Sequence, residues 1–340
     1  MNKLRLIKPI EYALLLVHLI IGLCVVNDYG ISWDEPLQRN HGLVSMDYIN
    51  EVSGYQLFDK RFSEDTWAGY PYKDHGVIFQ LTCLSIEKGF GISDYRSKFM
   101  IRHVIGFLIF SIGAFAFYFL LRKRWGYRWA MVGFLFLILS PRIFAHSFYN
   151  PKDTVALGWY CLCLFTGVRF LDNSSWSNAV LHAVATALLV NSRLFGVYIL
   201  FTTCGLYMVN QVLNANWTLK KWKWLPYTSY VILTILFIHL IWPNMWEDPF
   251  NNLYYGLRRV SKYHWLGEIL FFGHWVPAQN IPWYYLPVWI GITTPILYVI
   301  SFIVGLLLWS IKSIRELITA QTSKINAQDL DLQRIEIEAK

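Results

Sequence analysis

The chain has 340 residues, of which 55% are hydrophobic and only 15% are charged. This composition excludes an ordinary soluble domain as well as disordered, collagen-like and coiled-coil proteins. The five cysteines are odd in number and mostly lie in apolar runs, so neither a disulfide framework nor a zinc site is expected. The formal net charge of +8 fits nucleic acid, anionic lipid or a topology signal. We therefore predict an all-α polytopic membrane protein.

The apolar runs predict the membrane spans. The first run, Tyr12 to Val26, follows Lys3, Arg5 and Lys8 and precedes no small-residue cleavage pattern, which indicates a retained signal anchor. Further runs cover residues 101–121, 129–139, 155–171, 179–190, 194–213, 227–242 and 284–309. A span needs roughly 17 to 25 residues, so about eight transmembrane helices are expected. The short runs 129–139 and 179–190 suit helices that line a cavity.

Basic clusters indicate the orientation. If the N-terminus is cytoplasmic, most inward segments are basic, and these include residues 122–128, Lys220, Lys221, Lys223, Lys312 and Arg315. The basic excess is then a topology signal, and no nucleic-acid partner is predicted. We expect a transmembrane domain at residues 1–311 with outer loops at 27–100 and 243–282, followed by a polar cytoplasmic tail at residues 312–340.

The first outer loop contains a predicted interfacial helix. Its apolar residues recur at helical spacing: Leu37, Val44, Tyr48, Val52 and Tyr55. Just before it, Asp34 and Glu35 follow the first span closely, so their carboxylates are expected at the outer membrane surface. A carboxylate there could accept a proton from an acceptor hydroxyl. The alternative is an acidic N-cap for a helix that starts after Pro36.

Lys73, Asp74, His75 and Gly76 form the second polar cluster of this loop. Consecutive residues cannot face one point from a helix, but a loop beside a glycine could present them together. An ordinary polar turn remains the alternative. Asp74 and His75 could be metal ligands, but no clear third ligand follows them, so no metal site is predicted.

Basic residues near two further spans are candidate anion ligands. Arg142, His146 and Lys152 lie in the segment from Ser140 to Asp153 and could hold a phosphate. The alternative is a basic turn that contacts lipid phosphates nonspecifically. Arg193 stands between two apolar runs and needs an anionic partner, which could be a bound phosphate or a structural carboxylate. The second outer loop adds Arg258.

These pieces resemble a family when they are taken in chain order. Their placement is similar to that in membrane glycosyltransferases of the C-type (GT-C) fold, the superfamily of protein O-mannosyltransferases and the lipid A aminoarabinose transferase. The resemblance extends from about Leu14 to Leu308. The features that carry it are Asp34-Glu35, Asn150-Pro151-Lys152-Asp153, Arg193-x-x-Gly196, and Trp283-Tyr284-Tyr285-Leu286-Pro287 with Thr293-Thr294-Pro295.

The resemblance implies transfer of a hexose or pentose from a polyprenyl-phosphate donor to a protein, lipid or glycan acceptor on the extracytoplasmic face. Asp34 would be the base, with Glu35 as its neighbour or substitute, and the anomeric carbon would be inverted. The implied ligands of the donor phosphate are Arg193 and Lys152, helped by Lys73, Arg142 and Arg258. Asp74, His75, His146, Asp153 and Tyr284 are further substrate-site candidates. No cofactor or metal is implied.

Two departures from the family are visible. The Lys73 to Gly76 stretch is only loosely similar to the Lys-Pro-Pro stretch of the aminoarabinose transferase, so no sugar or acceptor class can be transferred through it. Family members are usually longer, which makes residue 312 a candidate truncation point. Location in a bacterial inner membrane is expected. Two other classes stay open: a transporter or flippase for a lipid-linked sugar, and a noncatalytic membrane scaffold.

Overall fold

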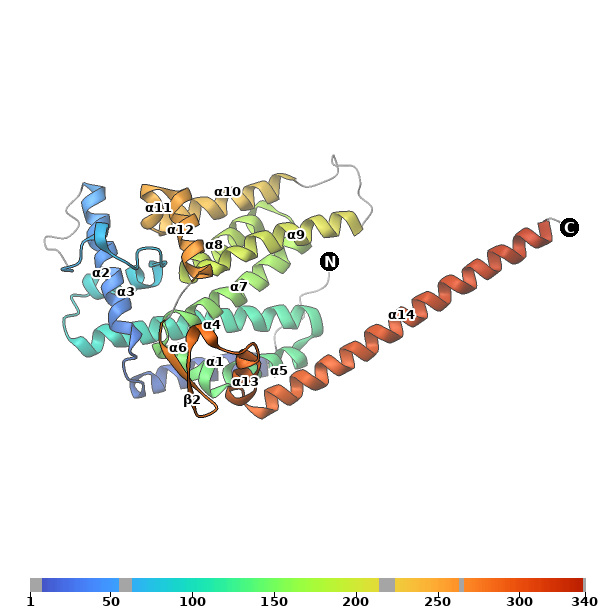
Figure 1. Cartoon of the computed structure of the whole chain (residues 1–340), viewed down its shortest axis with the longest axis horizontal. Coiled ribbons are helices and arrows are strands. Elements are labelled where there is room, and N and C mark those ends of the chain that lie inside the picture. Colours follow the sequence, from blue (N-terminus) through green and yellow to red (C-terminus); the bar gives the residue numbers. More distant parts are fainter. Residues whose placement is uncertain (1–7, 55–62, 214–223, 263–265, 339–340) are drawn as a thin grey trace. The chain divides into compact units, whose positions relative to one another are not determined.

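The computed structural model describes residues 8–54, 63–213, 224–262 and 266–338 (Figure 1). The residues Lys3, Arg5, Tyr55, Lys220, Lys221 and Lys223, which entered the predictions above, lie outside these ranges. The chain divides into two units, Met1–Tyr263 and His264–Lys340, which we describe separately.

The regular elements in the described part of the first unit are all helices, joined by turns and loops. Its elements are α1 (Pro9–Val25), η1 (Val26–Asp28), α2 (Asp34–Ser53), η2 (Trp67–Gly69), α3 (Ile78–Gly89), α4 (Tyr95–Trp125), α5 (Tyr127–Ile138), α6 (Pro141–Tyr149), α7 (Asp153–Asp172), α8 (Trp176–Ser192), η3 (Leu194–Val197), α9 (Tyr198–Leu213), α10 (Trp224–Ile241), α11 (Asn244–Glu247) and α12 (Pro249–Ser261).

The second unit begins with a β-hairpin and ends with a long helix. Its elements are β1 (Glu268–Phe271), β2 (His274–Pro277), η5 (Ala278–Asn280), α13 (Tyr285–Thr293) and α14 (Ile296–Glu338). Phe272 and Gly273 both have positive φ, at 50° and 80°, as a tight two-residue hairpin turn requires. The helix α14 runs without a break across residues 311 and 312, the boundary between the predicted transmembrane domain and the predicted tail.

All the apolar runs are largely helical, but the expected count of eight spans is not confirmed. Among the residues that the structure describes, six helices are long and apolar enough to cross a membrane, and the bent pair α5–α6 would make a seventh. The helix α8 has 17 residues and is not among them. The segment that follows Ser140 forms the short helix α6, which bends away from α5 by 63°. The chain is therefore an all-α polytopic membrane protein with fewer candidate spans than expected.

Small residues allow the central helices to pack closely. The helix α7 packs between α4 and α8, and α8 also packs against α10. At the crossing of α4 and α7, a Cβ on Gly113 would come within 2.3 Å of the Gly158 carbonyl oxygen. Membrane helices use such glycines to bring their backbones together. This close packing fixes the N-terminal end of α7, where Lys152 lies.

The predicted helix of the first outer loop exists as α2, but its apolar stripe is not one face. Val44 and Tyr48 are buried, whereas Leu37 and Val52 are exposed. All eight residues from His41 to Tyr48 are buried, so the middle of α2 is packed within the protein on every side. That an outer leaflet covers the rest of α2 stays a prediction.

Candidate functional site

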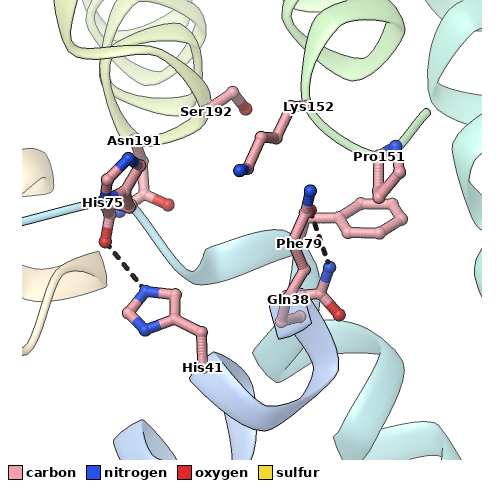
Figure 2. Close-up of a pocket in the computed structure, with 10 residues that line it drawn as sticks. Gln38, His41, His75, Phe79, Pro151, Lys152, Asn191 and Ser192 are labelled. Atoms are coloured by element: carbon pink, nitrogen blue, oxygen red, sulfur yellow. Dashed lines mark hydrogen bonds between the residues drawn. The ribbon is translucent and has the colours of Figure 1, made fainter. Parts of the chain in front are cut away.

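Four segments far apart in the sequence line one polar pocket of the first unit (Figure 2). The pocket holds about 410 Å³ of space, part of which is open to solvent. Its walls come from α2, from the turn and first residues of α3, from the N-terminal side of α7 and from the C-terminal end of α8. The lining residues are Gln38, His41, His75, Gly76, Phe79, Gln80, Pro151, Lys152, Asn191 and Ser192.

Lys152 supplies the positive charge of this pocket. Its side chain points into the space between Asn191, His75 and Phe79 (Figure 2). Burial lowers the pKa of Lys152, the charge of Asp34 opposes that shift, and the nearby Arg193 adds to it. Among the residues that the structure describes, none forms a salt bridge with Lys152. An ammonium group placed in this way has room for an anionic ligand.

Asp34 lies on the face of α2 that leads to the pocket. It is exposed, and the pocket residues Gln38 and His41 follow it at positions i+4 and i+7, which share one helix face. The carboxylate is also close enough to Lys152 to shift its pKa. The predicted base therefore lies near the predicted phosphate ligand Lys152, although Asp34 does not itself line the pocket.

Glu35, the predicted neighbour or substitute of Asp34, faces the other way. Its side chain is fully buried, and its Oε1 lies 3.0 Å from Nε2 of His103 on α4. Its Oε2 accepts a hydrogen bond of 2.7 Å from the backbone N–H of Ser32. The helix α2 begins at Asp34 with Trp33 as its N-cap and has no side-chain cap hydrogen bond, so neither carboxylate is the acidic N-cap that the sequence offered as the alternative. The arrangement gives Glu35 no access to the pocket.

Arg193 and Asp153 form an ion pair with each other. Asn150 extends this pair, because its amide nitrogen lies 3.1 Å from Asp153 Oδ2 and 3.0 Å from Nδ1 of His146. The backbone N–H of Asp153 in turn donates to Asn150 Oδ1 at 2.9 Å. Arg193 therefore has a carboxylate partner in the structure, its role towards a phosphate stays a prediction, and the pair lies at the N-terminus of α7 next to Lys152.

The segment of Lys73, Asp74 and His75 is a turn, as one of the two readings predicted. Asp74 Oδ1 lies 3.3 Å from His75 Nδ1 and 3.1 Å from Nη1 of Arg259. Burial alone would raise the pKa of Asp74, but the hydrogen bond and charge of His75 together with the charge of Arg259 lower it below its ordinary value. Asp74 therefore organises the turn as an ionised carboxylate.

Gly76 lets this turn touch the end of α8. A Cβ at Gly76 would come within 1.5 Å of the Asn191 carbonyl oxygen, so no other residue fits here without a shift. The Asn191 side chain completes the contact, since its Oδ1 accepts a hydrogen bond of 2.7 Å from the backbone N–H of Ile78. Two walls of the pocket are thus joined at this point.

His41 forms the floor of the pocket and is neutral. Burial lowers its pKa to about 4. Its Nε2 lies 3.0 Å from the carbonyl oxygen of His75, which can only accept, so Nε2 carries the proton. The ring also stacks on Tyr70, with centroids 5.5 Å apart. His41 therefore supports the turn as a rigid neutral donor.

A buried ion network holds Gln80, which lines the pocket, from behind. Glu87 of α3 pairs with Arg39 of α2 and, at 3.3 Å, with Arg102 of α4. Arg102 Nε donates to Gln80 Oε1 at 3.3 Å, and Gln80 Nε2 donates to Gln38 Oε1 at 3.4 Å. The network joins α2, α3 and α4 behind the pocket.

The remaining predicted residues lie outside the pocket lining. Arg142 is exposed in the first turn of α6, and Arg258 is exposed on α12. Lys73 is half-buried, and its carbonyl accepts a bond of 3.4 Å from Nε1 of Trp242. Tyr284 belongs to the second unit, where it is exposed beside Phe271. Their predicted roles stay predictions.

No cluster of potential metal ligands is found in the part of the chain that the structure describes. There, no three side chains among His, Cys, Asp and Glu come close enough together to hold one ion. The polar groups gathered at the pocket are instead a lysine, amides and imidazoles, which suit an anion and hydroxyl groups.

A known protein family matches the region from the start of α4 to the end of α10. Residues 93–242 match the family described as dolichyl-phosphate-mannose-protein mannosyltransferase. The resemblance to GT-C-type glycosyltransferases is confirmed. The matched segment contains Lys152, Asp153 and Arg193 but not Asp34. It supports, in general, a membrane glycosyltransferase that uses a lipid-phosphate-linked sugar. No curated protein and no solved structure matches the chain.

Sequence reasoning missed several residues of the site. Gln38 and His41 repeat the position of Asp34 along one face of α2, and that spacing was visible in the sequence. Gln80 carried no such signal, because it lies inside an apolar run. Arg259 rather than Arg258 reaches the Asp74 turn, and the sequence alone does not distinguish two adjacent arginines.

Proposed function

We propose that the chain transfers a sugar from a polyprenyl-phosphate donor to an acceptor hydroxyl or amine at the extracytoplasmic surface, with inversion at the anomeric carbon. The observation that carries this proposal is Lys152, a half-buried cation that points into a polar pocket beside the carboxylate of Asp34. The family match supports the donor class.

In this proposal Lys152 binds the donor phosphate. The negative charge on that phosphate grows as its bond to the anomeric carbon breaks, so a fixed cation stabilises the transition state more than the ground state. Arg193 contributes a second positive charge next to Lys152 while Asp153 holds its guanidinium in place. Lys73, Arg142 and Arg258 remain secondary candidates for the same phosphate.

Asp34 acts as the base. The acceptor oxygen or nitrogen forms the new bond to the anomeric carbon on the face opposite the phosphate, and its proton passes to the Asp34 carboxylate. The bond between the anomeric carbon and the phosphate oxygen breaks, and polyprenyl phosphate leaves with the electron pair. Glu35 takes no part, because its carboxylate is buried against His103.

The test is release of polyprenyl phosphate in liposomes that contain a set of labelled polyprenyl-phosphate sugars. The native chain should turn over at least one donor, and Asp34→Asn should lower kcat at least 100-fold because the amide cannot accept the proton. Asp28→Asn is the matched control, since Asp28 is an exposed carboxylate near the same end of the first span. Chelator should leave the rate unchanged.

Lys152→Gln tests the phosphate site separately. We expect both weaker donor binding and slower turnover, about 10-fold to 1,000-fold in kcat/KM, whereas Arg96→Gln, at an exposed arginine near the start of α4, should have little effect. Equal activity of the Asp34 and Asp28 variants would refute the assignment of the base. Donor binding without turnover by the native chain would favour a carrier-binding protein or flippase instead.

A further inference from the structure

The helix α12 of the first unit presents three distinct faces. It begins at Pro249 after the N-cap Asp248, whose Oδ1 accepts a bond of 3.2 Å from the Asn251 backbone, and it ends at Ser261. Its amphipathic pattern was not anticipated from the sequence, which placed the interfacial helix in the first outer loop. The faces differ in what they contact.

The first face of α12 is docked on the protein. Gly256 is buried, and a Cβ there would meet Leu194 Cδ2 at 3.0 Å. Leu253 packs against the cluster that contains Trp242 and Met245. On the same side, Arg259 Nη1 donates to the Pro71 carbonyl at 2.6 Å, in addition to its contact with Asp74. This face ties α12 to the turn that forms one wall of the pocket.

The second face is apolar and largely exposed, and in the described part of the chain its Tyr254 makes a ring contact with the adjacent Tyr255. Phe250, Tyr254 and Leu257 follow one another at positions i, i+4 and i+7, so they form one stripe. Their side chains are 84%, 57% and 36% exposed. An aromatic stripe of this kind is costly to leave in water.

The third face carries polar and basic residues together with the exposed Tyr255. Asn251, Arg258 and Lys262 lie at i, i+7 and i+11, which places them on one side of the helix, next to the apolar stripe. All three are exposed. A helix with an apolar aromatic face beside a basic face is typical of segments that lie in the plane of a membrane surface, where the cations meet lipid phosphates.

The position of α12 in the chain identifies the surface that covers it. The candidate span α10 ends at Ile241, and only the short helix α11 separates it from Pro249. The chain therefore leaves the hydrocarbon region just before α12 begins, at the depth where aromatic side chains are favoured. Three features indicate that a lipid surface covers α12: the apolar stripe, the basic face beside it and the continuity of the chain with a candidate span.

We propose that α12 lies in the membrane interface, with Phe250, Tyr254 and Leu257 inserted among the lipids and Arg258 and Lys262 at the phosphate level. Arg259 then links the membrane surface to the Asp74 turn and fixes that wall of the pocket at a set depth. This inference does not depend on the proposed transferase activity, because its test needs no turnover.

The test is the depth of spin labels attached to single cysteines in the full chain, in nanodiscs of phosphatidylethanolamine and phosphatidylglycerol. Cys24→Ser removes the native cysteine that is exposed. Labels at Tyr254→Cys and Leu257→Cys should collide several-fold more with oxygen than with a water-soluble nickel chelate. The matched control is Asn251→Cys on the polar face, for which the order should reverse.

Two results would overturn the proposal. Free collision of the labels at positions 254 and 257 with the nickel chelate would place the stripe in water. Protection from both oxygen and nickel would show that a protein, such as a second copy of the chain, covers it. The link through Arg259 has its own readout: Arg259→Gln should increase the mobility of the label at position 254, whereas Arg258→Gln should not.

Discussion

Arg193 and Lys152 differ in how much each would gain from binding a phosphate, because they have different partners in the structure. Arg193 already shares its charge with Asp153, whereas Lys152 points into the pocket without a salt bridge among the described residues. Removing water from a charge costs free energy that only a partner restores. A phosphate that enters the pocket would supply that partner for Lys152, so this residue gains more from the ligand than Arg193 does.

His41 should make the stability of the first unit depend on pH. Its folded pKa is about 4, below the ordinary value of 6.5, so the unfolded chain binds its proton first as the pH falls. The stability that depends on neutral His41 is fully present above pH 6.5 and is lost as the pH falls towards 4. This loss lowers the free energy of unfolding by at most about 3 kcal/mol. In thermal unfolding of the detergent-solubilised protein, His41→Gln should lose less Tm between pH 7 and pH 4.5 than the native chain.

The matched control for that measurement is His75→Gln. The carbonyl that His41 contacts belongs to the backbone of His75 and survives this substitution, while the exposed His75 ring is removed. Its pH profile should follow the native one more closely than that of His41→Gln. Parallel profiles for the native chain and His41→Gln would contradict the assignment.

At the scale of elements, the contact between the turn and α8 leaves no space at Gly76. Gly76→Ala should destabilise the protein by about 2 kcal/mol or more, because the new methyl group overlaps the Asn191 carbonyl. Gly30→Ala is the control, since a Cβ there meets nothing within 4 Å and its cost should stay within about 0.5 kcal/mol. Thermal unfolding of both variants measures this, and equal Tm values would show that the two segments are not in contact.

The buried pairs of Glu87 predict a second effect on packing. Glu87→Gln leaves Arg39 and Arg102 without their carboxylate behind the pocket and should cost about 3–5 kcal/mol, visible as a large loss of Tm or of folded protein. Asp172→Asn removes an equally charged but exposed partner of Lys123 and Arg124, and should cost about 1 kcal/mol or less. Similar losses for both variants would refute the structural role of Glu87.

At the scale of the whole molecule, the basic clusters predict which ends of the helices face the cytoplasm. With Cys24→Ser as background, Glu51→Cys should react with a membrane-impermeant maleimide added outside intact cells, and Arg124→Cys should react only after the cells are opened. Both positions are exposed, so the difference reports sidedness rather than burial. The reverse pattern would invert the orientation and place the pocket on the other side.

The fold could largely be predicted from the sequence because the bilayer demands long apolar runs, and each run is indeed helical over most of its length. The number of spans could not, since the bend after Leu139 and the 17 residues of α8 depend on packing. The site could be predicted only in part. Lys152 stood out as a charge beside an apolar run, but Gln80 and His41 join it in the pocket lining only when four segments meet.

That meeting of segments has a consequence for synthesis. The last wall of the pocket, Asn191 and Ser192, leaves the ribosome well after the other three. A nascent or proteolysed chain that ends before this point therefore lacks the complete pocket, even when α1, α4 and α7 are already inserted.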